Sequence, residues 1–181
     1  GTSTATVTVT VNGPGIDGDG ASDSVEDLTP VNTPNGTQGD GNNDGIQDSA
    51  QQNVASLPIA NGTGNNAGNF ITVAAPANTG LTQVQSAPIP SPETAPSGVD
   101  FPLGQVSFKV ESLTTGQSTV VELVMPRGVS VVSYYKFGPT TPGGADEWFE
   151  FLWDGTPGSV GAEILAETVT QPADSVESML T

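Results

Sequence analysis

Strict alternation of polar and apolar residues begins the chain. From Thr4 to Val11, the apolar residues Ala5, Val7, Val9 and Val11 alternate with four threonines. A period of two over this length predicts a β-strand with one buried face. The Asn-Gly-Pro tripeptide that follows is typical of a turn and ends the predicted strand.

Short β-branched or aromatic runs, bounded by Gly, Pro, Asn or Thr, fill the later part of the chain. We predict strands at 70–75, 105–113, 119–125, 129–137, 148–153 and 162–169. Only residues 22–28 and 48–54 suit one or two helical turns. This pattern predicts an all-β fold, an antiparallel β-sandwich of jelly-roll or immunoglobulin-like kind. Its predicted core consists of Phe70, Val73, Phe101, Val106, Phe108, Val110, Val121, Leu123, Val131, Tyr135 and Phe151.

Composition divides the chain into four parts. Residues 1–14 hold the N-terminal strand, 15–57 form an acidic, Gly- and Asn-rich segment, 58–170 form the sandwich, and 171–181 are a polar tail. The acids concentrate in the second part, where residues 17–48 contain eight Asp or Glu and no Lys or Arg. The predicted organisation is a β-domain preceded by a small acidic module.

Charge and missing residue types exclude several functions. The 181 residues include 20 Asp and Glu but only 3 Lys and Arg, giving a formal net charge of −17. Such a chain is repelled by nucleic acids and by anionic lipid surfaces, and its apolar runs are too short to insert into a membrane. With no His and no Cys, imidazole or thiolate catalysis, ordinary zinc, haem and iron–sulfur sites, and disulfides are excluded.

A calcium-loop pattern lies at residues 40–51. A calcium loop takes oxygen ligands at positions 1, 3, 5, 7, 9 and 12, with Gly at position 6 for a sharp turn. Gly45 occupies the sixth position. The predicted ligands are Asp40, Asn42, Asp44, the carbonyl of Ile46, Asp48 and Gln51. Gln51 is the weak member, because an amide cannot supply the bidentate carboxylate usual at position 12.

A degenerate copy of this loop spans residues 15–26. Gly20 fixes its register as the sixth residue, and position 1 carries no ligand. The predicted ligands are Asp17, Asp19, the carbonyl of Ala21, Asp23 and Glu26. The missing ligand would come from water, from Asp27 or from the neighbouring loop, and a bare acidic turn is the alternative to an occupied site.

These residues carry a resemblance to known families. The segments 17–20 and 40–48, reading Asp-Gly-Asp-Gly and Asp-Gly-Asn-Asn-Asp-Gly-Ile-Gln-Asp, resemble thrombospondin type 3 calcium repeats. The segments 53–58, 98–104, 133–139, 148–155 and 161–164 are similar to bacterial "choice-of-anchor" β domains of secreted surface proteins. The resemblance implies an extracellular, non-enzymatic β domain that often follows calcium repeats.

The chain departs from that family at its C-terminal end. Residues 165–181 are short and polar, without the further β structure and anchor that the family has. We therefore expect the sandwich to lack a strand and the segment 4–11 to be donated to a neighbouring copy. The competing interpretation makes that segment the last strand of an upstream domain, and the absence of Met at position 1 indicates a processed or excised chain.

Two further constellations have structural alternatives. Trp148, Phe149, Phe151 and Trp153, with the two tyrosines, could form a platform for sugar rings, but alternation along a strand places at least one set in the core. Four acids, Glu122, Asp146, Glu147 and Glu150, could include a glycosidase pair, but they occupy ordinary strand and turn positions.

The sequence thus predicts a calcium-stabilised structural subunit of an extracellular bacterial assembly, not an enzyme. Copies of itself are its predicted partners, through head-to-tail strand donation. The alternative is a stalk, adhesion or carbohydrate-binding module of a larger secreted surface protein, and a hydrolase is the third class.

Overall fold

The computed structural model describes residues 15, 17–60, 68–89, 95–141, 143–157 and 159–165. The predicted strand 4–11 and tail 171–181 lie outside the described residues, as do residues 166–169 of the last predicted strand. Contacts divide the chain into two compact units, Gly1–Val129 and Ser130–Thr181.

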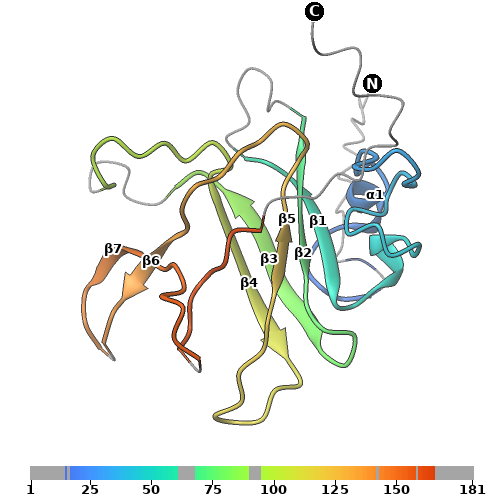
Figure 1. Cartoon of the computed structure of the whole chain (residues 1–181). Coiled ribbons are helices and arrows are strands. Elements are labelled where there is room, and N and C mark those ends of the chain that lie inside the picture. The colour runs from blue at the N-terminus through green and yellow to red at the C-terminus, as the bar shows by residue number, and fades with distance from the viewer. Residues whose placement is uncertain are drawn as a thin grey trace, which may run out of the picture. The chain divides into compact units, whose positions relative to one another are not determined.

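Two antiparallel sheets form the first unit (Figure 1). One has the order β1-β2-β5, from β1 (Val54–Pro58), β2 (Phe70–Ala74) and β5 (Glu122–Val124), and the other pairs β3 (Gly80–Ala87) with β4 (Gln105–Glu111). A single hydrophobic cluster joins residues of both sheets: Ala21, Ala55, Leu57, Val73, Ala75, Leu81 and Val84. The prediction of an all-β fold with antiparallel sheets is confirmed, while the sandwich type stays a prediction.

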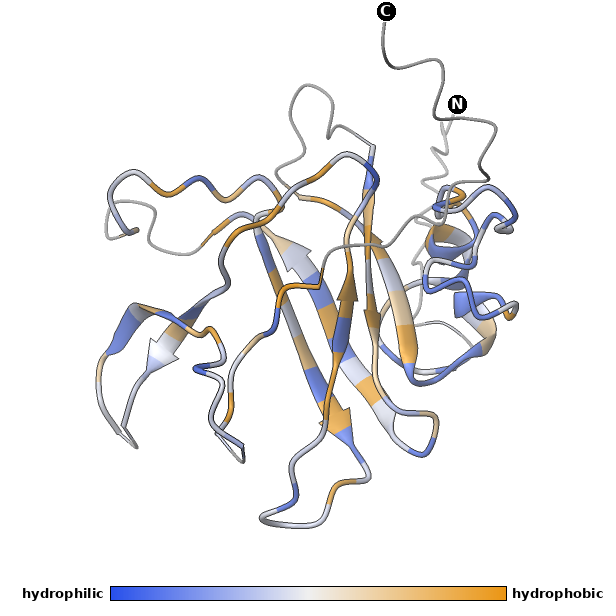
Figure 2. Cartoon of the chain, viewed as in Figure 1, coloured by the Kyte–Doolittle hydropathy of each residue, from blue (hydrophilic) through white to orange (hydrophobic). Residues whose placement is uncertain are grey.

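Strand β1 is buried on both faces. Ala55 and Leu57 belong to the hydrophobic cluster, whereas Ser56 shares a hydrogen bond with Thr72 of β2, both side chains being buried. Figure 2 shows the hydrophilic N-terminal part of the described chain beside the largely hydrophobic β1. A strand covered on both faces loses simple alternation, and β1 was not among the predicted strands.

Strand β3, also not predicted, contains a bulge. The register against β4 shifts between Thr82 and Gln85, and Gln83 has a φ of 55°. Regular alternation would place Leu81 and Val84 on opposite faces, but the extra residue turns both into the core, where they are 0% and 2% exposed.

The predicted core is only partly correct. Val73 is fully buried, and five others are partly buried against the cluster: Val106, Phe108, Val110, Val121 and Leu123. Phe70, Phe101, Val131, Tyr135 and Phe151 are also only partly buried. The prediction missed Ala55, Leu57, Ile71, Leu81 and Val84, which are buried.

The second unit contains one strand pair, β6 (Tyr135–Pro139) with β7 (Asp146–Glu150). The rings of Phe137 and Trp148 pack across the pair in a tilted arrangement, with 5.1 Å between centroids and 52° between ring planes. Leu152 and Ala162 form an isolated parallel bridge. Strand β6 starts six residues later than the predicted run 129–137, and β7 starts two residues earlier than the predicted run 148–153. Every described residue of this unit is at least partly exposed.

The acidic segment belongs to the first unit. Its helices α1 (Asp23–Glu26) and η1 (Asp48–Ala50) both contact β1. The contacts thus group the acidic segment with the sheets of the first unit, and the predicted four-part division stays a prediction.

Candidate metal centre

The acidic loop at residues 40–51, which we call the second loop, lies directly on the polar face of β1 and β2. Gly41 N donates to Asp48 Oδ2 over 2.9 Å, and Ser56 Oγ donates to the same oxygen. A Cβ at position 41 would lie 2.6 Å from Ser56 Oγ and would overlap Thr72 Oγ1. A glycine is required here because any side chain would push the loop away from the sheet.

The acidic loop at residues 15–26, which we call the first loop, lies against the bulge of β3. Val84 N donates to the carbonyl of Asp19 over 3.2 Å. Gly20 has a φ of 109°, and a Cβ at this position would lie 2.9 Å from the backbone nitrogens of Gln83 and Val84. The bulge and Gly20 therefore fit together and hold Asp19 at the sheet edge.

Three acids from the first loop converge. Asp17, Asp19 and Glu26 each place a carboxylate oxygen within 4.8 Å of the other two. Asp19 and Glu26 are both 0% exposed, although carboxylates are almost never fully buried without a partner. We name these three residues the carboxylate cluster.

One oxygen of each cluster residue has no partner. Asp19 Oδ1 accepts from Ala21 N over 2.8 Å, and Glu26 Oε1 accepts from Ser56 N over 3.2 Å. Asp17 Oδ2, Asp19 Oδ2 and Glu26 Oε2 are buried without a hydrogen bond, and so is Asp48 Oδ1 nearby. Orphaned buried oxygens of this kind are what a bound cation would satisfy.

Burial and mutual repulsion disfavour the charged forms. Burial, and after it the negative charge of Asp19, raise the pKa of Glu26 to about 8. Burial likewise raises the pKa of Asp19 and of Asp48 to about 6 each. The pKa of Asp17 is raised too, by burial and by Asp23. Without a cation, Glu26 is therefore largely protonated at neutral pH.

Asp40 and Asp44 of the second loop find hydrogen-bond donors within that loop. Asp40 accepts from Asp44 N and Gly45 N over 3.1 and 3.0 Å, and Asp44 Oδ1 accepts from Ile46 N over 2.9 Å. Gln51 Nε2 donates to both oxygens of Asp44. The weak twelfth-position residue of the sequence pattern thus pairs with the fifth-position acid.

The predicted ligands therefore fall into two groups. The cluster collects Asp17, Asp19 and Glu26, and Asp23 is close enough to raise the pKa of Asp17 and Asp19. The Ala21 carbonyl accepts from Gly15 N. In the described part of the chain, no three acids of the second loop meet in a comparable group: Asp40 and Asp48 are buried, Asp44 is exposed, Asn42 donates to Asp44, and Ile46 is 54% exposed.

Asp48 connects the two loops electrostatically, which the loop pattern did not reveal. Its charge raises the pKa of both Asp19 and Glu26. The ligand missing from the first loop was expected from water, from Asp27 or from the neighbouring loop, and Asp48 is the acid of that neighbouring loop whose charge acts on two residues of the cluster. The residues at the contact between the second loop and the sheet, Gly41, Ser56 and Thr72, were not predicted. The only signal for them is a small loop residue together with hydroxyl residues in the strands that it contacts.

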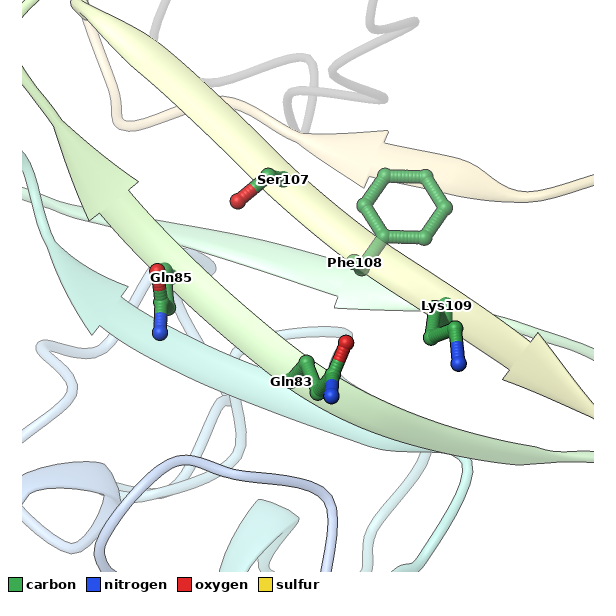
Figure 3. Close-up of a pocket in the computed structure, with 5 residues that line it drawn as sticks. All are labelled: Gln83, Gln85, Ser107, Phe108 and Lys109. Atoms are coloured by element: carbon green, nitrogen blue, oxygen red, sulfur yellow. The ribbon is translucent and has the colours of Figure 1, made fainter.

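The other candidate sites have different surroundings. A pocket on β3 and β4 is lined by Gln83, Gln85, Ser107, Phe108 and Lys109, without a carboxylate (Figure 3). In the second unit, Glu147 and Glu150 are exposed acids that accept from Thr140 and Ser133. There, Lys136 Nζ lies 3.3 Å from the centroid of the Phe151 ring and covers one of its faces.

Comparison with protein-family models, curated proteins and solved structures gives no match. The resemblance to thrombospondin type 3 repeats and choice-of-anchor domains therefore stays a prediction. No helix in the described residues is long and apolar enough to cross a membrane.

Proposed function

We propose that this protein is a non-enzymatic, calcium-stabilised structural subunit of an extracellular bacterial assembly. In this proposal, calcium holds the acidic segment on the sheets, and residues 4–11 are donated to a neighbouring copy to build a filament. The observation that supports it best is the carboxylate cluster with its orphaned buried oxygens.

Calcium suits the donors of this cluster. Asp17, Asp19 and Glu26 offer only oxygen, and Ca²⁺ is a hard cation that takes six to eight oxygens in flexible geometry. Mg²⁺ requires near-octahedral geometry and keeps its waters, which fits a largely buried group less well. Extracellular calcium modules bind with dissociation constants of about 10⁻⁴ to 10⁻³ M, so calcium outside a cell would fill such a site.

The position of the cluster favours a structural role. Glu26 accepts from the β1 backbone at Ser56, and Asp19 accepts from the β3 backbone at Val84. A cation held by these two acids would bind the loop to both sheets at once.

Calcium titration tests the first half of the proposal. We expect calcium uptake by the full chain with a rise in its unfolding temperature, and a much smaller response to equal concentrations of magnesium. Asp19→Asn should weaken calcium uptake, whereas Glu122→Asn, a change of an exposed acid on β5, should not. Absence of uptake by the unaltered chain would contradict the proposal.

Removal of residues 1–11 tests the second half. We expect the truncated chain to bind calcium as a monomer while the full chain forms polymers under the same conditions. Polymers of the truncated chain, or a full chain that stays monomeric in calcium, would exclude strand donation.

An adhesion or carbohydrate-binding module is the second candidate. The partly exposed aromatic group of Tyr134, Phe149 and Phe151 favours it. Because Lys136 covers one face of the Phe151 ring, less flat aromatic surface remains for sugar stacking, so we rank this function second.

A further inference from the structure

The two sheets of the first unit have four strand edges, and the acidic segment covers two of them. On β1, Ser56 N donates to Glu26 Oε1. On β3, Val84 N donates to the Asp19 carbonyl, and Leu81 N donates to the Gln52 carbonyl over 2.7 Å. These edges are therefore blocked against addition of another strand.

The remaining edges belong to β5 and β4, and they differ in length. Strand β5 has three residues, while β4 has seven. Within the described residues, β4 pairs only with β3. A seven-residue edge to which no further described strand is paired is a ready acceptor for an added strand, whereas a three-residue edge offers few backbone groups to set the register.

One side of β4 is apolar and incompletely covered. Val106, Phe108 and Val110 are partly buried against the hydrophobic cluster, while Ser107 and Lys109 on the opposite face are exposed. Figure 3 shows the Phe108 ring extending from β4 on the side away from Gln83 and Gln85 of β3. A strand added at this edge would cover the ring if its own apolar side faced the cluster.

Residues 4–11 have the required properties. The segment has eight residues, close to the seven of β4, and its apolar and polar side chains alternate strictly. Its four apolar residues would continue the apolar side of β4, and its threonines would continue the polar face. It carries no charge in a chain of net charge −17, so the approach of another copy is not opposed at this segment.

We propose that the outer edge of β4 is the acceptor site for residues 4–11 of a second copy. This inference rests on the proposed function, because it names the site that strand donation would use. The chain leaves the first loop at Gly15, which donates to Ala21 beside the blocked edge of β3.

The connection is too short for residues 4–11 to reach the same chain's β4 edge. A strand added to the outer edge of β4 would lie about three strand spacings, roughly 14 Å, from the loop that covers the outer edge of β3. The steps from Val11 to Gly15 span at most about 14 Å when fully extended, which leaves no length for a path over the side chains of the sheet. A second copy has no such limit, and its donation would propagate head to tail.

Engineered cysteines test the acceptor site without interference, since the chain has no cysteine of its own. Full-length copies carrying Thr6→Cys, Thr8→Cys or Thr10→Cys are each mixed, in calcium and under mild oxidation, with a copy of different mass carrying Ser107→Cys. Because a disulfide needs Cβ atoms about 3.8 Å apart, we expect one donor position to give linked heterodimers at several times the yield of the others. Glu122→Cys on β5 is the matched acceptor control, on the other open edge, and should give only background.

Each other outcome contradicts the acceptor assignment. Heterodimers through Glu122→Cys, or polymers without any link to Ser107→Cys, would show that donation uses another site and would leave the proposed function standing. A chain carrying both Thr8→Cys and Ser107→Cys that links only within itself, when diluted in cysteine-free protein, would show insertion in the same copy. A full chain that never polymerises in calcium overturns both this inference and strand donation.

Discussion

The two carboxylate oxygens of Glu26 have different surroundings. Its Oε1 accepts from the β1 backbone, whereas its Oε2 is buried without a partner. Burial and the charge of Asp19 raise its pKa to about 8. The residue therefore favours the fold when it is protonated or bound to a cation, and opposes it when it is charged and alone.

We predict that Glu26→Gln stabilises the metal-free protein and weakens calcium binding. The amide can still accept from Ser56 N, and its NH₂ group can donate to the neighbouring carboxylates. The free energy of unfolding in a chelator should rise by about 1 kcal/mol or more at pH 8. The calcium dissociation constant should rise roughly tenfold or more, because fewer ligand charges remain.

Chemical unfolding in chelator and calorimetric titration measure the two effects. Glu122→Gln removes the same charge from an exposed position on β5 and should change neither quantity appreciably. An unchanged calcium affinity in Glu26→Gln would remove this residue from the metal centre.

At the scale of the elements, the acidic loops are fixed to the sheets through small residues and backbone. Gly41 lies against Ser56 and Thr72, and Gly20 lies against the bulge of β3. Neither contact involves an apolar side chain, so the attachment depends on close fit and buried hydrogen bonds. The second loop should thus separate from the sheets under changes that leave the hydrophobic cluster intact, whereas the first loop also places Ala21 in that cluster.

We predict that Gly41→Ala loosens the acidic segment selectively. Its Cβ would lie 2.6 Å from Ser56 Oγ and would force the loop outward, at a cost of about 1–3 kcal/mol, typical of overpacking. Hydrogen exchange of the Asp48 amide, which donates to the Gly39 carbonyl at the displaced loop, should accelerate, while the amides that pair β3 with β4 should keep their protection. Gly138→Ala, where nothing lies within 4 Å of the added Cβ, is the control, and equal exchange in both variants would refute the close fit.

The sequence predicted β4 through its alternation and missed β1 and β3, whose patterns are modified by tertiary contacts. Strand β4 alternates between exposed and partly buried residues, and it lies within a predicted run. The bulge at Gln83 breaks the alternation of β3, and two covered faces remove it from β1. For the site, loop spacing indicated the residues of the carboxylate cluster. It could not indicate Ser56 or Thr72, because their role depends on the pairing of β1 with β2.

For the whole molecule, the raised pKa values determine how stability depends on pH. Asp19 and Asp48, with pKa values of about 6, and Glu26, with about 8, bind protons in the folded state that they release in the unfolded state. The folded protein therefore holds more protons between the ordinary pKa values, near 4, and the raised ones. Stability is greatest below this range and falls as the pH rises through it.

We predict that the metal-free protein is more stable at pH 5 than at pH 8. Each proton released on unfolding contributes a slope of about 1.4 kcal/mol per pH unit. Calcium should reverse the trend, because it replaces the protons and binds more tightly as they leave. Urea unfolding at a series of pH values, with chelator and with calcium, measures both slopes. Glu26→Gln should flatten the metal-free slope between pH 6 and 8, and a metal-free stability that rises with pH would contradict the protonated site.

The contact between Ser56 N and Glu26 also bears on solubility. Exposed strand edges promote aggregation, and many proteins block them with lysine, proline or a bulge. Strand β1 has none of these before Pro58 at its last residue, and its edge is covered by a carboxylate instead. Because this cover depends on ionic conditions, it is reversible. Chelators that displace Glu26 from β1 would expose an aggregation-prone strand edge, so calcium in purification buffers would reduce aggregation.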